Sequence, residues 1–247
     1  DIKEQFRRVK DSSDLWALIK KFKCREFKIS GTVSAEDWVE HFRRVFGSVC
    51  GVVTYYAARN VEDQTLDKDI DMNELEGAFK TMRNNKAPGD NRVPAEFYKS
   101  TSKNYKEIIL TFSNAIVRGG QIPTGFPRSI IFPLHKKGDT NEVNNYRAIS
   151  FINAVAKVFS FILLRRLQLC EEREKIIKEN QCGFRRGYSA TDNIFVLFNI
   201  VMKTLNRPTK KLYCFFLGYD SVDREALFFK LSELGVSTKF IAMLRRL

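Results

Sequence analysis

Apolar residues recur every three or four positions along several stretches of the chain, a spacing that places them on one face of an α-helix. This spacing predicts amphipathic helices over residues 2–23, 34–46, 71–83, 103–118 and 189–205. In the last of these, the helical spacing directs Ile194, Leu197, Phe198 and Val201 inward. The segment Ile152–Gln168 is apolar on most sides and ends in Arg165-Arg166, which predicts a helix in the core.

Capping residues fix several helix ends. Asp71 and Glu74 form a capping pair, and Ser189 or Thr191 caps the helix over 189–205. Acidic residues in the segment 220–223 precede a helix over 224–234, which Gly235 ends. A final helix is predicted from Ser237 onward.

Two short apolar runs, Ile130–Leu134 and Lys211–Leu217, predict strands, the second of them buried. A few strands among many helices predict an α+β architecture. Residues 47–70 carry glycine, threonine and acidic residues without periodicity, which predicts a linker or mobile loop. The chain therefore divides into a helical N-terminal extension with its linker, 1–70, and a second region, 71–247.

The formal net charge of +13 favours a polyanionic partner. The alternative, a basic surface without a ligand, stays open on charge alone. The basic residues are not gathered on one amphipathic helix and no apolar run reaches transmembrane length, so no membrane role is expected.

The five cysteines have no metal-ligand spacing and their number is odd. We therefore expect reduced, mostly buried thiols in an intracellular protein, either nuclear or cytoplasmic. The two histidines, His41 and His135, are too far apart to form a local metal site.

Basic residues also occur in two loops beside predicted elements. Lys136 and Lys137 follow the first strand, Arg147 lies shortly after them, and a glycine-spaced loop runs from Gly183 to Gly187. Loops of this kind can bind a phosphate chain, because lysine acts as a point charge and arginine as a forked donor. Solvated surface charge is the alternative for each, and Phe184 could equally belong to a core.

Three sequence blocks in order resemble the reverse transcriptases of non-LTR (LINE-type) retrotransposons. They are NKAPGDNRVPAEFYK (85–99), PLHKKGD with NNYRAIS (133–139 and 144–150), and QCGFRRGYSATD (181–192). A strand and DSVDREAL (220–227) follow them. The resemblance implies an RNA-directed DNA polymerase of right-hand architecture, here its fingers and the start of its palm, behind a helical N-terminal region. Its partners would be RNA, DNA or an RNA–DNA hybrid.

The resemblance also implies roles for individual residues. Lys136, Lys137 and Arg147 would face the incoming triphosphate or template phosphates. The residues expected along the template are Gln181, Gly183, Phe184 and Arg185. Tyr219 falls where the family carries the aromatic that gates the sugar 2′ position.

The sequence departs from the family at its metal site. The family binds Mg²⁺ through carboxylates of a segment like VDFxKA and of a later paired-aspartate strand. This chain reads LYCFFLGYDSVDR over 212–224, about four residues shorter than the family form, and it has no paired-aspartate strand. Asp220 aligns with a later aspartate whose expected role is helix capping. We therefore expect no intact catalytic residue and no metal site.

Three hypotheses follow. The first is a degenerate or domesticated fragment of a retrotransposon reverse transcriptase that is polymerase-inactive and retains RNA or DNA binding. The second is part of an active polymerase whose remaining palm is supplied elsewhere, so the sequence leaves open whether the chain is an enzyme. The third is a protein-interaction scaffold, with a partner covering the incomplete palm.

Overall fold

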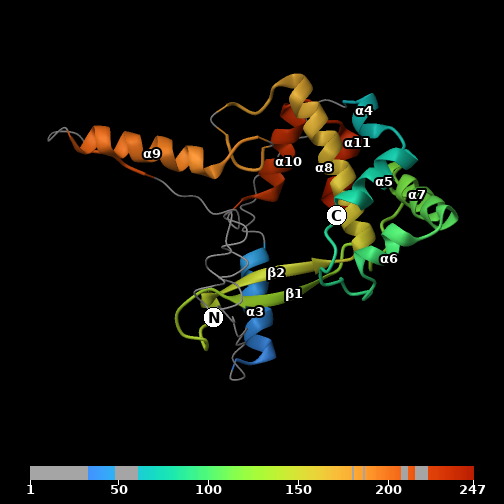
Figure 1. Cartoon of the computed structure of the whole chain (residues 1–247), viewed down its shortest axis with the longest axis horizontal. Coiled ribbons are helices and arrows are strands. Elements are labelled where there is room, and N and C mark those ends of the chain that lie inside the picture. The colour runs from blue at the N-terminus through green and yellow to red at the C-terminus, as the bar shows by residue number, and fades with distance from the viewer. Residues whose placement is uncertain (1–32, 48–60, 180, 186, 207–210, 215–221) are drawn as a thin grey trace, which may run out of the picture. The chain divides into compact units, whose positions relative to one another are not determined.

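The computed structural model describes residues 33–47, 61–179, 181–185, 187–206, 211–214 and 222–247 (Figure 1). The chain forms two compact units. Of the described residues, those in 33–45 and 131–149 form the hairpin unit, and those in 46–130 and 150–247 form the helical unit. The predicted helix over 2–23 lies outside the described residues.

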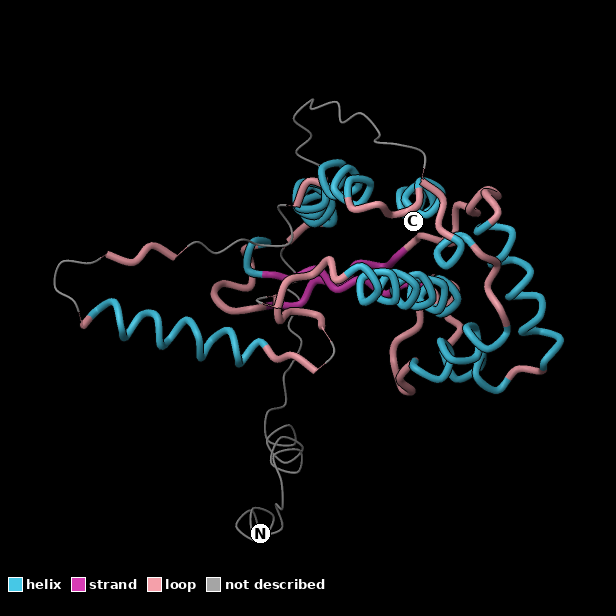
Figure 2. The backbone as a smooth tube through the Cα atoms, turned by 90° about the horizontal axis from the view of Figure 1, so that it is seen from above, coloured by secondary structure: helices cyan, strands magenta, loops and turns pink. Residues whose placement is uncertain are grey.

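The hairpin unit contains helix α3 (Ala35–Phe46) and most of the two strands β1 (Ser129–His135) and β2 (Tyr146–Ile152). The strands pair side by side, and a loop containing the short helix η1 (Val143–Asn145) joins them (Figures 1 and 2). Trp38 of α3 packs edge-on against Tyr146 of β2, with ring centroids 4.7 Å apart. The strand predicted at 130–134 is confirmed, although Ile130 and Ile131 at its start are exposed.

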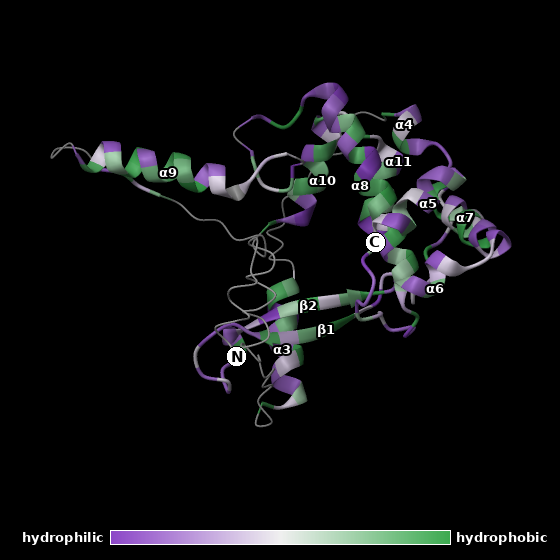
Figure 3. Ribbon diagram, in the orientation of Figure 1, coloured by the Kyte–Doolittle hydropathy of each residue, from purple (hydrophilic) through white to green (hydrophobic). Residues whose placement is uncertain are grey.

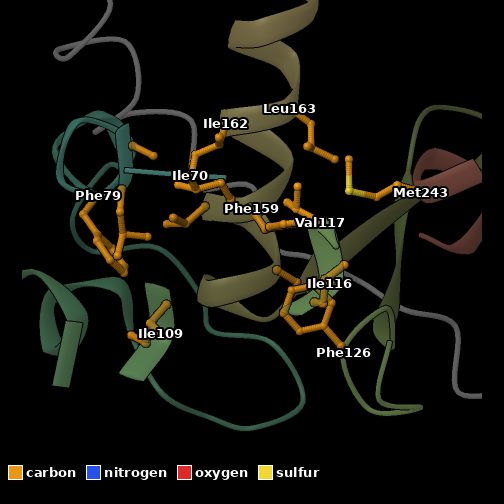
Figure 4. Packing of buried hydrophobic residues seen from close by; sticks show 14 of the residues in the cluster. Ile70, Phe79, Ile109, Ile116, Val117, Phe126, Phe159, Ile162, Leu163 and Met243 are labelled. Carbon is orange, nitrogen blue, oxygen red and sulfur yellow. The ribbon is translucent and has the colours of Figure 1, made fainter. Parts of the chain in front are cut away.

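Helix α8 (Ala154–Glu174) supplies much of the core of the helical unit. Its residues Phe159, Ile162 and Leu163 are at most 3% exposed and pack among apolar side chains of the surrounding helices (Figure 4). Those helices are α4 (Gln64–Asp67), α5 (Met72–Thr81), α6 (Ala95–Ser100), α7 (Lys103–Val117) and α11 (Thr238–Arg246). The core helix predicted at 152–168 is thus confirmed, and it continues to Glu174.

The predicted caps are present. Asp71 and Glu74 form a capping box at the start of α5. Ser189 and Asp192 form another at α9 (Ala190–Leu205). Asp223 accepts hydrogen bonds from two backbone N–H groups of α10 (Arg224–Glu233), and Gly235 follows that helix with φ +81°. Only glycine adopts this backbone conformation without strain.

The linker predicted over 47–70 is wrong in its last part. Residues 64–67 form α4, and the side chains of Leu66 and Ile70 are 0% and 3% exposed. Asp63 caps this short helix by accepting hydrogen bonds from the N–H groups of Thr65 and Leu66. A segment without helical periodicity in its sequence therefore contributes two residues to the core.

The buried strand predicted over 211–217 is not seen in its described part. Residues 211–214 are not in a strand, and they are exposed, with Tyr213 at 74%. Cys214 is exposed as well, whereas Cys170 and Cys182 are buried as predicted. Residues 215–217 lie outside the described residues.

The helix predicted over 189–205 is confirmed as α9, but its predicted inward face is wrong. Ile194, Leu197 and Phe198 are 66%, 37% and 59% exposed. Phe195 and Val196 between them are also exposed, so hydrophobic residues (green in Figure 3) are exposed on more than one side of α9. Helical spacing shows which residues share a face, but it does not show what covers that face.

Helices and one small sheet give a mixed helix-and-strand fold, compatible with the predicted α+β class. None of the described helices is long and apolar enough to cross a membrane.

Candidate nucleic-acid interface

The loop between β1 and β2 is held by its own hydrogen bonds. The N–H of Lys136 donates to the carbonyl of Asn145 at 2.8 Å, and the Asn145 side-chain amide donates to the carbonyl of Asp139 at 3.0 Å. Gly138 has φ +91°, and a Cβ there would lie 2.7 Å from Asn145 Nδ2. Glycine is required at this position because a side chain would be strained and would meet the amide that closes the loop.

This loop presents the cations that the sequence singled out. Lys136 and Lys137 lie exposed in the turn, and Arg147 is exposed on β2 next to Tyr146. Within the described part of the chain, none of the three side chains forms a salt bridge. Cations without a carboxylate partner keep their capacity to bind phosphate.

The second basic loop belongs to the helical unit and differs in character. Arg185 donates to the carbonyls of Lys178 at 3.1 Å and Gln181 at 3.4 Å, and its guanidinium lies 4.2 Å from the ring centroid of Tyr188. Arg185 therefore organises the loop from within. Its planar cation stacked on an aromatic ring is a common arrangement in proteins.

Phe184 is the most exposed large apolar side chain of this loop, at 86%. Its backbone lies in the left-handed region, with φ 62°. That conformation is uncommon for a bulky residue and is often found at functional sites. Gln181 is exposed beside it and donates to the carbonyl of Gly183 at 3.4 Å.

The structure thus groups the candidate residues in two sets. Lys136, Lys137 and Arg147 lie together in the hairpin unit, and 181–185 lie in the helical unit. Tyr219 and Asp220 lie outside the described residues, so their expected roles stay predictions.

The hairpin unit also contains a cavity of about 330 Å³ that was not predicted from the sequence. Helix α3 contributes His41 and Arg44 to its lining, and the β1–β2 loop contributes Asn141 and Glu142. His41 is 6% exposed, and its buried Nδ1 has no hydrogen-bond partner among the residues that the structure describes. Burial, with the nearby charges of Arg44 and Lys136, lowers the pKa of His41 below its usual value. No local spacing links residues 41 and 141, so only the fold could reveal this site.

The resemblance implies Mg²⁺, which requires a cluster of carboxylates. Among the described residues, no group of three or more His, Cys, Asp or Glu side chains could hold a metal ion. These residues therefore do not fit the metal.

Comparison with curated proteins finds retrotransposon enzymes. The chain is 32% identical over 157 residues to a probable RNA-directed DNA polymerase from transposon X-element of Drosophila melanogaster, covering 63% of this chain and 17% of that protein. It is 20% identical over 191 residues to the RNA-directed DNA polymerase from mobile element jockey of the same fly, covering 76% of this chain and 21% of that protein.

A third relative is an uncharacterized 149 kDa protein of transposon TX1 from Xenopus laevis, 23% identical over 74% of this chain and 14% of that protein. No protein-family model matches the chain. The chain spans only about a seventh to a fifth of the length of these relatives. The resemblance to the reverse transcriptases of non-LTR retrotransposons, first indicated by the three sequence blocks, is therefore confirmed over most of the chain.

Proposed function

We propose that this chain is a degenerate or domesticated part of a retrotransposon reverse transcriptase that binds nucleic acid and does not polymerise it. In this proposal, residues 71–247 correspond to the fingers and an incomplete palm of a right-hand polymerase. The observation that carries the binding function is the β1–β2 loop. It holds Lys136, Lys137 and Arg147 exposed and without carboxylate partners among the described residues.

The arrangement suits a phosphate chain. Lys136 and Lys137 are adjacent in a turn that Gly138 and Asn145 hold in shape, so their backbone does not have to be ordered on binding. A net charge of +13 adds a general attraction for polyanions. The relatives' names describe RNA-directed DNA polymerases, which supports a nucleic acid as the polyanion.

Affinity for single-stranded RNA, single-stranded DNA and an RNA–DNA hybrid, measured across a salt series, tests this proposal. The triple variant Lys136→Ala, Lys137→Ala, Arg147→Ala should bind more weakly. Its plot of log affinity against log salt should be shallower by roughly 0.7 for each lost contact on a single strand. The triple variant Lys80→Ala, Lys103→Ala, Arg165→Ala removes equal charge from exposed sites of the helical unit and serves as the control. Equal losses in the two variants would overturn a role for the loop.

Loss of polymerase activity is the second part of the proposal. It rests on the shortened segment 212–224, which lacks the family's VDFxKA portion. Primer extension on an RNA template with Mg²⁺ should give no product above a heat-denatured control. Template-dependent extension by this chain would overturn this part of the proposal and favour an active polymerase.

The exposed hydrophobic residues of α9 favour a second candidate function, binding of a protein partner. Ile194, Phe195 and Leu205 are 66%, 68% and 70% exposed. Contiguous apolar surface of this kind often marks an interaction site. Analytical ultracentrifugation of the natural chain and of the double variant Ile194→Ser, Phe195→Ser would show whether α9 drives association. A monomer at all concentrations for both proteins would contradict self-association through α9.

A further inference from the structure

The cavity of the hairpin unit carries an inference beyond phosphate binding. Its volume, about 330 Å³, is within the range of small-molecule sites. Its lining includes His41, Arg44 and the carboxylate of Glu40 from α3, and Asn141 and Glu142 from the β1–β2 loop. Carboxylates accept hydrogen bonds, arginine only donates, and the Asn amide does both. The lining therefore offers both donors and acceptors, together with some apolar surface.

His41 is the residue that most clearly needs a ligand. Buried polar atoms in folded proteins almost always have a hydrogen-bond partner, so each exception calls for an explanation. The Nδ1 of His41 is such an exception, and the ring that carries it lines the cavity. The lowered pKa keeps this ring neutral at physiological pH. A neutral imidazole can donate or accept a hydrogen bond at Nδ1, depending on its tautomer.

Two other groups of the lining are available to a ligand. Arg44 and Glu142 form no salt bridge within the described residues. Glu40, by contrast, lies 3.6 Å from Arg43. The cavity thus offers a donating cation from α3 and an accepting carboxylate from the β1–β2 loop.

We propose that this cavity binds a guanine base of a single-stranded RNA or DNA chain whose phosphates contact Lys136 and Lys137. Guanine presents the acceptors O6 and N7, which suit an arginine, and the adjacent donors N1–H and N2–H₂, which suit a carboxylate. The bases of single strands expose these edges and are read by such side chains. Adenine, cytosine and uracil each lack the pair of adjacent donors.

The position of the cavity agrees with this ligand. Asn141 and Glu142 belong to the same loop as Lys136 and Lys137, and the charge of Lys136 acts on His41. The sugar of a nucleotide links its base to its phosphate and limits their separation, so one loop can contact both. This inference rests on the proposed binding of nucleic acid by the β1–β2 loop.

The experiment uses uridine oligonucleotides of about ten nucleotides, the size of a typical single-strand site. Each carries guanosine, adenosine, cytidine or uridine at its centre. The guanosine strand should bind about tenfold more tightly than the others, since one well-placed bidentate contact discriminates by this order. Glu142→Gln should remove most of this preference, because an amide cannot accept from both donors of guanine, and His41→Phe and Asn141→Ala should each reduce it. The salt dependence should stay unchanged, because none of these variants removes a positive charge.

Asn144→Ala is the matched control, because Asn144 lies exposed in the same loop and does not line the cavity. It should retain the guanosine preference. Asn141 is itself exposed, so its variant keeps the test valid even where His41→Phe fails to fold. Equal binding of all four strands with a steep salt dependence would overturn the guanine site and leave phosphate binding intact. Absence of binding to every strand would overturn both.

Discussion

Arg166 places its cation in the interior of the helical unit. It follows Arg165 near the predicted end of a helix, where a basic residue is normally solvated. Instead, α8 continues to Glu174 and the Arg166 side chain is 1% exposed. It donates five hydrogen bonds, two to the Glu74 carboxylate and three to the carbonyls of Leu66, Lys68 and Asp69.

Replacement of Arg166 by methionine should therefore destabilise the helical unit strongly. The change leaves Glu74 and three carbonyls without their donor, and loss of one partner of a buried ion pair costs about 3–5 kcal/mol. Urea denaturation followed by circular dichroism would measure the change in the free energy of unfolding. Arg165→Met, at an exposed neighbouring position, should cost less than about 0.5 kcal/mol. Equal costs for the two variants would contradict the role of Arg166.

The ion pair between Arg166 and Glu74 makes the stability of the fold depend on pH. Desolvation acts to raise the pKa of Glu74, but hydrogen bonds from Arg166 and from the Asp71 N–H, with the charges of Arg166 and Lys68, lower it overall. A carboxyl whose pKa is lower in the folded state stabilises the fold above its unfolded pKa of about 4.3. This contribution is lost as the pH falls through the folded pKa.

Glu74→Gln should accordingly be less stable than the natural chain above about pH 5, with the difference shrinking at lower pH. Unfolding free energies at a series of pH values would measure this convergence. Glu107→Gln, on an exposed position of α7, controls for the change in net charge. A stability difference between Glu74→Gln and the natural chain that stays constant down to pH 3, about one unit below the unfolded pKa, would contradict the linkage.

At the scale of the element, periodicity and caps were sufficient for most helices. The helix starts at Asp71, Ser189, Asp223 and Ser237 were predicted from local residues and are confirmed, because capping is a contact between near neighbours. Burial was predicted less well. Helix α4 and the segment 211–214 were assigned the wrong environment, because burial depends on residues distant in the sequence.

Some residues of the candidate site could be singled out from the sequence, and others required the fold. Lys136, Lys137 and Arg147 could be identified from the sequence, since basic residues beside a strand and a glycine form a local pattern. The cavity with His41 and Asn141 could not, because two segments about a hundred residues apart form its wall. The internal contacts of Arg185 with Lys178, Gln181 and Tyr188 also required the fold.

Phe159 and Phe195 show how the burial of a side chain affects stability. Phe159 of α8 is 1% exposed and packs edge-on against Phe126, whereas Phe195 of α9 is 68% exposed. Phe159→Ala should cost about 3–5 kcal/mol through lost burial and a cavity. Phe195→Ala should change the free energy of unfolding by less than about 0.5 kcal/mol. Chemical denaturation of both variants would compare them, and a large cost at Phe195 would show that α9 is packed in solution.

For the whole molecule, the two basic loops belong to different units and offer different chemistry. The β1–β2 loop offers charges that have no carboxylate partner in the described part of the chain, so its contribution to binding should weaken with salt. The loop at 181–185 offers the exposed ring of Phe184, and its arginine is already used for internal contacts. Stacking of a base on a ring depends little on salt and requires an unpaired base.

Phe184→Ala should therefore weaken binding of single-stranded RNA about five- to a hundredfold, the usual range for one stacked base, without changing the salt slope. Binding of a fully paired RNA–DNA hybrid should change much less, because its bases are already stacked on one another. Phe184→Trp should retain affinity, since it keeps a stacking surface. Fluorescence anisotropy with labelled single strands and hybrids at two salt concentrations would measure all three effects. Equal losses on both substrates would instead indicate that alanine disturbs the loop, because the contact would then not depend on an unpaired base.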